Sequence, residues 1–536
     1  MKNIKTTFYL KTVIICLLAI VATVPVNSQT LLKTEQQRIK SRVDKMMQRA
    51  GLSTNPIGLQ IQIKKIIKQE KEPEIRRLEE ERKIKKILAT HANLPTLHFA
   101  NNPLRVQLNE AKAHKAKYQK DVAHMLARFN RYVAIESQSI DDPDPNAFPI
   151  TNGQKAIAQL IYGELQGIDG VEVKLSPDYY VYAKLPSNMK REVPSVLFLA
   201  HMDVSPEANG KGIKPQTHMY YNGGDIALGN GLVLSPETPA GAHLKQCKGH
   251  TIVTSDGTTL LGADDKTGCA ILVTMLEKLV ETEAKHGDVY ICLTQNEDVG
   301  KCAMRMDMSY FDRTPDILID VDGGNPGEYS VSNFTAEGRT YLFKGNLAHP
   351  SYGKEQGYAD ARTAMAYFIG QLPSETHPSH SEGRQGYIHC YDIQQLPNKQ
   401  DVRLRFRLRY FDKDEGAAFA QYMAKALENT RTAYPEVKIV MEDSTLQYEN
   451  IAYSMHPMAV KVIQKAAKDM SMPMAPKDLR AGTTASMMVA KGLPGGPSIY
   501  SGQNAEHSVY EWCSINDLVQ ITDLCIEIVA QVGKLK

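Results

Sequence analysis

The sequence predicts an α/β protein with a mostly parallel sheet, which is interrupted by a smaller α+β domain and preceded by an additional N-terminal helical segment. Short β-rich runs alternate with helical runs in two stretches of the chain. Longer strands and two helices separate these stretches, and a Lys-, Glu- and Ile-rich segment precedes them. Of the 536 residues 42% are hydrophobic and 23% are charged, which excludes collagen-like, coiled-coil and wholly disordered classes.

Residues 1–28 are predicted to be a secretory signal peptide. Lys2, Lys5 and Lys11 form a charged start, residues 13–24 are almost unbroken apolar, and small residues suitable for cleavage follow. We therefore expect an exported protein, periplasmic or secreted, with an uncleaved anchor as the alternative. No later stretch approaches the ~20 apolar residues of a membrane span.

Residues 29–120 are predicted to form a basic helical arm, with helices at 30–50 and 59–92. The arm holds 21 Lys and Arg against 9 Asp and Glu, a net charge of +12, whereas residues 121–536 hold 39 against 51, a net charge of −12. Opposite charges of this size favour an arm that packs against the acidic body. The competing interpretation is an arm that binds an anionic membrane surface.

Nucleic acid is not expected as a partner of the arm. Between residues 29 and 120 the only aromatic side chains are Phe99 and Tyr118, and the segment is rich in Glu. Binding of single-stranded nucleic acid depends on aromatic side chains for base stacking.

The remaining chain is predicted to form one α/β domain in two parts, 121–332 and 446–536, with an inserted α+β lid domain at 333–445. A helix is expected to begin at Asp121. The other elements expected in the first part are strands at 171–175, 181–185, 195–200, 289–294 and 316–322 and a helix at 268–282. The elements expected in the insertion are strands at 340–346, 386–393, 402–411 and 437–443 and helices at 360–372 and 416–429.

Seven cysteines follow the predicted signal peptide, from Cys247 to Cys525. Because seven is odd, at least one of them is free. The absence of a Cys-x-x-Cys pair argues against a zinc knuckle. Export would permit a disulfide, but the sequence does not indicate which cysteines would pair.

Acidic and imidazole side chains gather where apolar strands are expected to end. His201 and Asp203 follow the strand at 195–200, Glu297 and Asp298 follow the strand at 289–294, and Asp322 ends the strand at 316–322. Ligands of an open α/β sheet bind at the carboxyl ends of its strands. We therefore expect these side chains to converge.

Two further residues extend this set. Asp264 comes just before a helix, where a carboxylate is also expected as a cap, and His507 lies near the C-terminus. Two imidazoles with three carboxylates suit zinc, or another divalent ion such as cobalt or manganese.

These residues lie in motifs that resemble the dizinc exopeptidases that include peptidase T. HMDVSPE, GGDIALG, LLGADDKTG, NEDVGKCA, DVDGG and a final His-x-x-x-Glu occur in the order and spacing of that family. GGDIALG with LLGADDK is particular to peptidase T rather than to the family's carboxypeptidases and aminoacylases. The resemblance covers Asp121 to the C-terminus. It implies a zinc domain interrupted by a lid domain, removal of the N-terminal residue from short peptides, chiefly tripeptides, and a homodimer formed through the lid.

The resemblance also implies the ligands of two Zn²⁺ ions. His201 and Asp322 match the terminal ligands of one ion, and Asp298 and His507 match those of the other. Asp264 matches the carboxylate that bridges both.

Four further roles follow from the resemblance. Asp203 matches the residue that holds the ligand imidazole in its tautomer, and Glu297 matches the general base. His349 matches a lid histidine that approaches the developing oxyanion, and Arg409 matches an arginine that binds the substrate's terminal carboxylate. Arg409 also alternates with other arginines, so a solvated strand face is the alternative for that residue.

The sequence departs from the family at two positions. Asp298 stands where the family usually has Glu, and Thr484 stands where peptidase T has an aspartate. We interpret the chain as an exported zinc aminopeptidase for short peptides. A carboxypeptidase or amidohydrolase of the same family is one alternative, and an inactive scaffold that binds an anionic surface through its basic arm is another.

Overall fold

The computed structural model describes residues 103–144, 146–323 and 325–535. The predicted signal peptide and the helices expected at 30–50 and 59–92 lie outside these residues. Helix α4 (Pro103–Val133) runs through Asp121 without interruption, so the prediction that a helix begins at Asp121 is wrong. Residues 104–120 contain neither Gly nor Pro, and so nothing in that stretch ends a helix.

An eight-stranded sheet in the order β1-β2-β8-β3-β9-β16-β10-β15 forms the centre of the fold. The strands are β1 (Glu172–Leu175), β2 (Val181–Leu185), β3 (Val196–His201), β8 (Val289–Thr294), β9 (Ile317–Gly323), β10 (Glu328–Asn333), β15 (Ala475–Leu479) and β16 (Ser498–Tyr500). The middle strands β8, β3, β9 and β16 are parallel to one another, and β10 is parallel to β15. The predicted α/β class with a mostly parallel sheet is confirmed.

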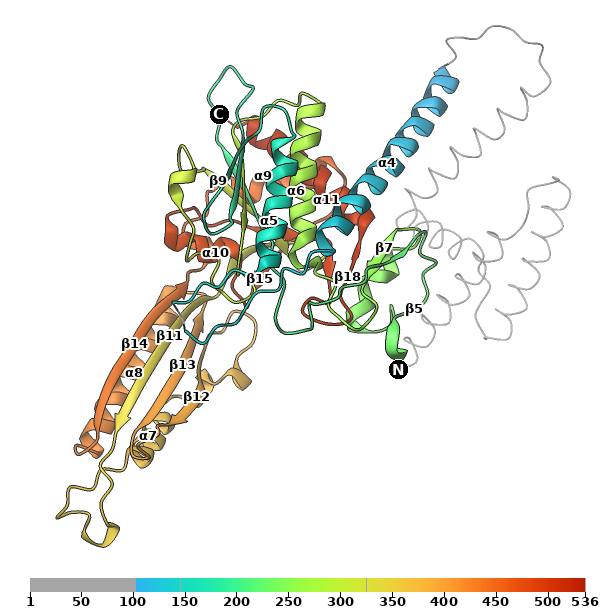
Figure 1. Ribbon diagram of the computed structural model, residues 1–536. Helices are drawn as coiled ribbons and strands as arrows, with labels where there is room; N and C mark the ends of the chain where they lie inside the picture. The colour runs from blue at the N-terminus through green and yellow to red at the C-terminus, as the bar shows by residue number, and fades with distance from the viewer. Residues whose placement is uncertain (1–102, 145, 324, 536) are drawn as a thin grey trace, which may run out of the picture. The chain divides into compact units, whose positions relative to one another are not determined.

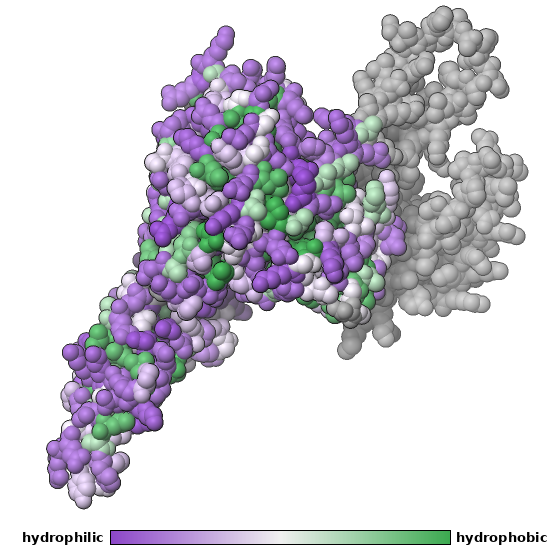
Figure 2. Space-filling view, in the orientation of Figure 1, coloured by the Kyte–Doolittle hydropathy of each residue, from purple (hydrophilic) through white to green (hydrophobic). Residues whose placement is uncertain are grey.

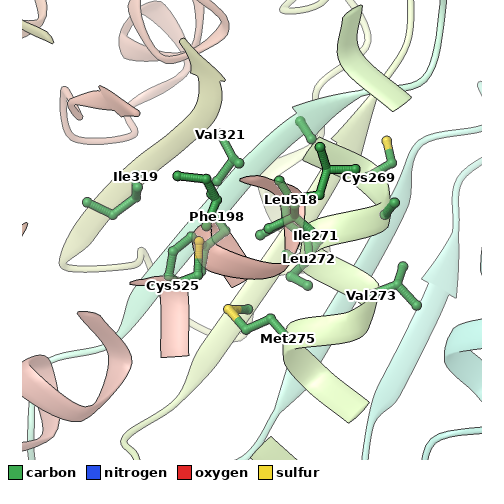
Figure 3. Close-up of a cluster of buried hydrophobic side chains, with 14 of the residues drawn as sticks. Phe198, Cys269, Ile271, Leu272, Val273, Met275, Ile319, Val321, Leu518 and Cys525 are labelled. Atoms are coloured by element: carbon green, nitrogen blue, oxygen red, sulfur yellow. The ribbon is translucent and has the colours of Figure 1, made fainter. Parts of the chain in front are cut away.

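Helices cover this sheet and bury its apolar side chains (Figure 1). The helices of the α/β part after α4 are α5 (Asn152–Gln166), α6 (Ala263–Glu281), α9 (Ala459–Asp469), α10 (Thr484–Met488) and α11 (Ile515–Gly533). Figure 3 shows Phe198 and Ile319 of the sheet among side chains of α6 and α11. Leu197 and Leu199 of β3 point to the opposite face and pack in a second cluster with α10. A strand that is buried on both faces is a continuous apolar run, which is why the sequence predicted these strands.

Segments that connect strands and helices of the central sheet form a separate, smaller sheet in the order β17-β18-β7-β4. Its strands are β4 (Gln216–His218), β7 (Ile252–Thr254), β17 (Gln503–Asn504) and β18 (Trp512–Ser514), and a hairpin is formed by β5 (Ile226–Ala227) and β6 (Val233–Leu234). The buried Trp512 ring donates its Nε1 proton to the carbonyl oxygen of Ala240, 2.8 Å away, in the 3₁₀ helix η2 (Pro239–Gln246). The other 3₁₀ helices are η1 (Gly229–Gly231), η3 (Met308–Tyr310), η4 (Pro350–Tyr352), η5 (Ser374–Thr376), η6 (Pro378–His380), η7 (Ile451–Tyr453) and η8 (Val489–Lys491).

The inserted α+β part is an antiparallel sheet in the order β12-β13-β11-β14, which we call the lid sheet. Its elements are β11 (Thr335–Lys344), α7 (Ala361–Gly370), β12 (Tyr387–Gln395), β13 (Val402–Tyr410), α8 (Lys413–Ala433) and β14 (Lys438–Tyr448). Phe406 of β13 packs with Phe368 of α7 and Phe419 of α8 on one face. The arginines of β13 alternate with the buried residues and lie on the other face, as the period of two predicts.

The surface in Figure 2 is mostly hydrophilic, with small apolar patches scattered over it. Within the described ranges, none of the helices is both long and apolar enough to cross a membrane. All seven cysteines from Cys247 to Cys525 are free thiols.

Candidate metal centre

Three neighbouring strands of the central sheet bring the predicted ligands together. His201 is the last residue of β3, Glu297 and Asp298 follow β8, and Asp322 is near the end of β9. Because β8, β3 and β9 are adjacent and parallel, their carboxyl ends meet at one edge. The predicted convergence of these side chains is therefore what the structure shows.

Asp264 lies between two imidazoles and offers one carboxylate oxygen to each. Its Oδ1 is 2.8 Å from Nε2 of His201, and its Oδ2 is 3.2 Å from Nε2 of His507. Asp322 Oδ2 lies 3.7 Å from the same nitrogen of His201, and Asp298 Oδ1 lies 2.9 Å from that of His507. Two groups of three potential metal ligands thus share Asp264.

The buried carboxylate of Glu511 holds the loop that carries Asp264. Glu511 accepts hydrogen bonds from the backbone N–H groups of Leu261 at 2.6 Å, of Gly262 at 2.7 Å and of Asp264 at 2.9 Å. Gly262 has a φ of +78°, a left-handed conformation that favours glycine. These contacts fix where α6 begins and therefore where Asp264 points.

Acidic groups also orient the two imidazoles. Nδ1 of His201 lies 3.2 Å from the carbonyl oxygen of Asp203 and 3.5 Å from its Oδ1, which leaves Nε2 toward Asp264. Nδ1 of His507 lies 3.1 Å from Oε2 of Glu207, with the same result. A partner on one ring nitrogen that directs the other toward a metal is typical of metal-binding histidines.

Asp203 has a second task that the sequence did not reveal. Its Oδ1 accepts the backbone N–H of Glu297 at 3.1 Å, and its Oδ2 accepts that of Asp298 at 3.3 Å. The same buried carboxylate therefore positions both the first imidazole and the turn after β8.

Two glutamines complete the support. Gln503 Nε2 donates to Oδ1 of Asp322 at 3.0 Å, so Oδ2 is the oxygen that faces His201. Gln154 Nε2 donates to Oδ1 of Asn296 at 2.7 Å and steadies the turn before Glu297. Gln154, Glu207, Gln503 and Glu511 were not predicted as site residues. Only Glu207 and Glu511 lie within the quoted motifs, HMDVSPE and His-x-x-x-Glu.

The acids of this cluster differ in how firmly they hold protons. Burial raises the pKa of Glu297 to about 8 and that of Asp298 to about 7, and neighbouring carboxylates act in the same direction. Burial also raises the pKa of Asp322 above its usual range. Burial would raise the pKa of Asp264 too, but its contacts with His201 and His507 outweigh burial and hold that pKa well below its usual range.

The imidazoles show the complementary shift. Contacts with Asp264 and Asp298 raise the pKa of His507 to about 11. Buried carboxylates in excess over cationic groups are costly, and a divalent cation relieves that cost.

The donor set fits a divalent metal. It offers imidazole nitrogens and carboxylate oxygens, which borderline ions such as Zn²⁺ accept. Oδ2 of Asp298 is buried and has no hydrogen-bond partner within the structure's described ranges, so it is available as a ligand atom. His201 and Asp322 would hold one ion, Asp298 and His507 a second, and Asp264 both.

The two predicted substrate residues lie on the lid sheet. Arg409 of β13 donates to Oε1 of Gln447 at 3.2 Å, and its guanidinium lies 5.6 Å from the ring centre of Tyr448. His349 is exposed in the loop after β11, where its Nδ1 accepts the N–H of Ser351 at 3.3 Å. Strand β11 begins at Thr335, just after β10 of the central sheet, and its ten residues span roughly 30 Å. His349 lies beyond the far end of this strand. The structure therefore does not bring His349 to the metal ligands of its own chain.

Comparison with known proteins identifies the family. The chain is 34% identical over 410 residues to peptidase T of Bacillus pumilus (strain SAFR-032), an alignment that covers 75% of this chain and 97% of that protein. The chain belongs to the peptidase T family. Peptidase T of Bacillus subtilis (strain 168) is 31% identical over 410 residues, with coverage of 76% and 98%. The chain is accordingly a metallo-exopeptidase.

Two further comparisons give a partial match to a family model and a shared fold. The family model described as M42 glutamyl aminopeptidase matches residues 246–345. The solved aminopeptidase PepT of Bacillus cereus ATCC 10987 is similar with a TM-score of 0.59 at 19% identity, over 77% of this chain and 99% of that one. A dinuclear metal binding peptidase of the M20 family from Bacillus subtilis is similar with a TM-score of 0.51 at 11% identity, over 76% and 98%. At such identities the structures show a shared fold.

Proposed function

We propose that this peptidase T relative is an exported, zinc-dependent aminopeptidase that removes the N-terminal residue from short peptides, with tripeptides favoured. The observation that carries the proposal is the carboxylate of Asp264, which offers one oxygen to each of two imidazole–carboxylate groups. Glu297, which immediately precedes Asp298 of one group, adds a side chain that can move a proton.

Two zinc ions are proposed because the donors divide into two groups around Asp264. The Bacillus subtilis neighbour described as a dinuclear metal binding peptidase supports the same number. Zinc at this position supplies Lewis acidity, which polarises a peptide carbonyl and lowers the pKa of water. The chain's own contribution is to fix the ligands, through Asp203, Glu207, Gln503 and Glu511.

Glu297 is proposed as the general base. Asp298, the next residue, has its Oδ1 directed at His507, whereas the Glu297 carboxylate makes no hydrogen bond to any residue that the structure describes. It is therefore free to take a proton from the attacking water on its Oε atom and to deliver that proton to the leaving amine. The two adjacent acids would thus divide ligand and base between them.

Arg409 is proposed to bind the carboxylate at the far end of a short peptide. Its partner Tyr448 is close to the centre, because it packs against the cluster that contains Leu199 of β3, the strand that ends at His201. Tyr448 also lies against Gly482, where an added Cβ would come within 2.7 Å of the ring. An arginine at a fixed distance from the reacting carbonyl would select peptides by length. The names peptidase T and tripeptidase, carried by relatives and by a solved neighbour from Staphylococcus aureus with a TM-score of 0.58 at 19% identity, agree with a short substrate.

A homodimer through the lid sheet is proposed as the source of the oxyanion histidine. His349 lies far from the ligands of its own chain, so a His349 that serves this centre belongs to a second copy. The lid sheet exposes apolar side chains that a dimer would bury: Tyr391 (43% exposed), Ile393 (54%), Met441 (53%) and Leu446 (50%). Ile393→Asp should give a monomer of reduced activity in light scattering and hydrolysis assays, and a dimer that persists would contradict this surface.

Export is proposed from the N-terminal sequence alone, namely the charged residues Lys2, Lys5 and Lys11 and the apolar run that follows. N-terminal sequencing of the protein from fractionated cells tests it. A mature protein that begins near Gln29 is expected, and a cytoplasmic chain that retains Met1 would contradict export.

Product analysis on di-, tri- and tetrapeptides tests the reaction itself. Free tripeptides should lose their N-terminal residue, N-acetylated tripeptides should be poor substrates, and a chelator should abolish turnover. Release of the C-terminal residue first would replace the aminopeptidase by the carboxypeptidase alternative. Thr484 stands in the place of the family's aspartate and is fully buried. A preference for peptides of a length other than three is therefore the result that would inform on this substitution.

A further inference from the structure

A second group of potential metal ligands lies outside the centre described above. His243, Cys247 and Asp517 offer donor atoms that are all within 4.8 Å of one another. We call these three residues, with the adjacent His250, the Cys247 cluster. His243 lies in η2, Cys247 ends that helix, His250 precedes β7, and Asp517 is in the first turn of α11.

The contacts within the Cys247 cluster centre on the Asp517 carboxylate. Nε2 of His243 lies 2.7 Å from Oδ2 of Asp517, and Nδ1 of His250 lies 3.5 Å from Oδ1. The Cys247 thiol is fully buried and donates a hydrogen bond to the His243 carbonyl oxygen at 3.4 Å. Nδ1 of His250 also lies 2.9 Å from Oγ of Ser514. The His243 imidazole therefore contacts the carboxylate directly, and the thiol and the His250 imidazole lie around this pair.

Helix capping does not account for Asp517. A carboxylate in the first turn of a helix usually accepts a hydrogen bond from a free backbone N–H. In α11 that task falls to Ser514, whose Oγ accepts the N–H of Asp517 at 3.2 Å. Both carboxylate oxygens of Asp517 are consequently directed at imidazoles.

The surroundings exclude water and hold His243 in place. Its ring stacks on that of buried Trp512, with ring centres 6.0 Å apart, and lies edge-on to Tyr500 at 5.9 Å. The side chains of His243 and Asp517 are only 12% and 11% exposed. A ligand group that packing holds rigid in this way loses little entropy when it binds an ion.

The donor chemistry identifies the ion. One thiolate and one carboxylate balance the charge of a divalent cation, and two neutral imidazoles complete four ligands without adding charge. A neutral buried assembly avoids the cost of isolated buried charge. Zinc accepts thiolate, imidazole and carboxylate ligands, and four protein ligands are usual in its structural sites.

We propose that His243, Cys247 and Asp517, with His250 as the fourth donor, bind a structural Zn²⁺ ion. The Cys247 proton leaves to solvent as the Zn–S bond forms. Four protein donors leave no open position, so this site would not take part in hydrolysis.

The position of the cluster gives the ion a structural task. It would join η2 and the loop before β7 to the start of α11. Strand β18 leads directly into α11, and the loop between β17 and β18 carries His507. A metal at the Cys247 cluster would thus stabilise the small sheet that holds one of the proposed catalytic ligands.

Cobalt substitution tests this site independently of the catalytic centre. The ligand groups around Asp264 contain no cysteine, so only a site with a thiolate can give a sulfur-to-cobalt charge-transfer band in the near ultraviolet. The full chain, stripped of metal and reloaded with Co²⁺, should show this band. Cys247→Ser should lose it, and Cys390→Ser, which removes a half-buried thiol of the lid sheet, should retain it.

Metal analysis gives a second readout that does not need a variant. Wild-type protein saturated with Zn²⁺ should hold one ion more than the two proposed for the catalytic centre, and His243→Ala should lose one ion and unfold at lower temperature. A wild-type protein that takes up Co²⁺ without any thiolate band would overturn the proposal and leave the Cys247 cluster as a hydrogen-bonded contact. Because this outcome concerns sulfur ligation alone, it would leave the proposed aminopeptidase activity untouched.

Discussion

Two buried charge clusters of the α/β part are built in opposite ways. In the first, Arg128, whose side chain is 3% exposed, meets Glu164 Oε2 at 3.0 Å and Glu277 Oε2 at 2.8 Å. Burial alone would raise the pKa of each glutamate, but the hydrogen bonds from arginine outweigh it and hold both pKa values below 4.5. Each acid of this cluster is matched by a cationic partner.

In the second cluster, around Asp264, the acids exceed the cationic groups. There the pKa values of Glu297 and Asp298 are raised to about 8 and about 7 by burial. The comparison shows that burial alone does not set the pKa of an acid, because cationic partners can reverse the shift. Matched acids stabilise a fold, whereas unmatched ones beside oriented imidazoles are ready for a cation.

The largest effect is expected from removal of the shared carboxylate. Asp264→Ala should lose both metal ions and reduce peptide hydrolysis to background, because each proposed ion loses a ligand. Metal content after dialysis and hydrolysis of a tripeptide measure the two effects. Asp523→Ala, which removes a half-exposed partner of Lys278, is the matched control and should change neither. An Asp264→Ala protein that keeps both ions would contradict the role of Asp264 as a ligand shared by the two ions.

The next largest effect separates the two neighbouring acids. Glu297→Gln should slow turnover by about 10²–10⁴-fold and leave the metal content unchanged, because loss of a general base has this magnitude. Asp298→Asn should lower the metal content instead. If the two variants show the reverse pattern, the roles of Glu297 and Asp298 are exchanged.

The matched cluster should respond in stability rather than activity. Arg128→Met removes the buried partner of Glu164 and Glu277 and leaves beside them only the more exposed Arg131 and His124. It should lower the free energy of unfolding by about 3 kcal/mol at neutral pH. Both glutamates have pKa values below their usual 4.5 in the folded state, so their contribution is present above pH 4.5 and is lost as the pH falls through the lowered values. Urea unfolding should therefore show a gap between wild type and variant that shrinks at acid pH. A gap that grows at acid pH would contradict the assigned direction.

The smallest effect is expected at the edge of the metal centre. Glu207→Gln should weaken metal binding by about tenfold, the low end for residues behind a ligand, because Glu207 is 70% exposed. Competition with a chelator measures the affinity. Gln503→Ala removes the hydrogen bond to Oδ1 of Asp322 and should weaken metal binding more, because Gln503 is buried. Equal effects of the two variants would show that burial of the supporting residue does not change its contribution to metal affinity.

Much of this architecture could be predicted from the sequence. Strand β3 is a continuous apolar run that ends at His201, so the sequence indicates both the strand and the residue at its carboxyl end. The alternation of β13 predicted which face of the lid sheet is buried. His201, Asp298 and Asp322 follow from the same logic, since parallel strands end at one edge. Asp264 and His507 do not end a strand of that sheet, and their roles were expected from the motifs.

The rest depends on contacts between segments that are distant in the chain. Strands β17 and β18 have two and three residues, too few to show a period. The contact of Glu207 with His507 joins residues 300 positions apart, and sequence spacing carries no signal for it. The cis peptide bond between Asp264 and Asp265 is of a kind too rare outside proline to be expected.

Anomalous diffraction at the zinc edge from crystals of the zinc-loaded protein tests the central claim most directly. The claim is that Asp264 is shared by two ions, one held with His201 and Asp322 and the other with Asp298 and His507. The account predicts two anomalous peaks that flank the Asp264 carboxylate. A single peak there, or peaks that Asp264 does not touch, would contradict it.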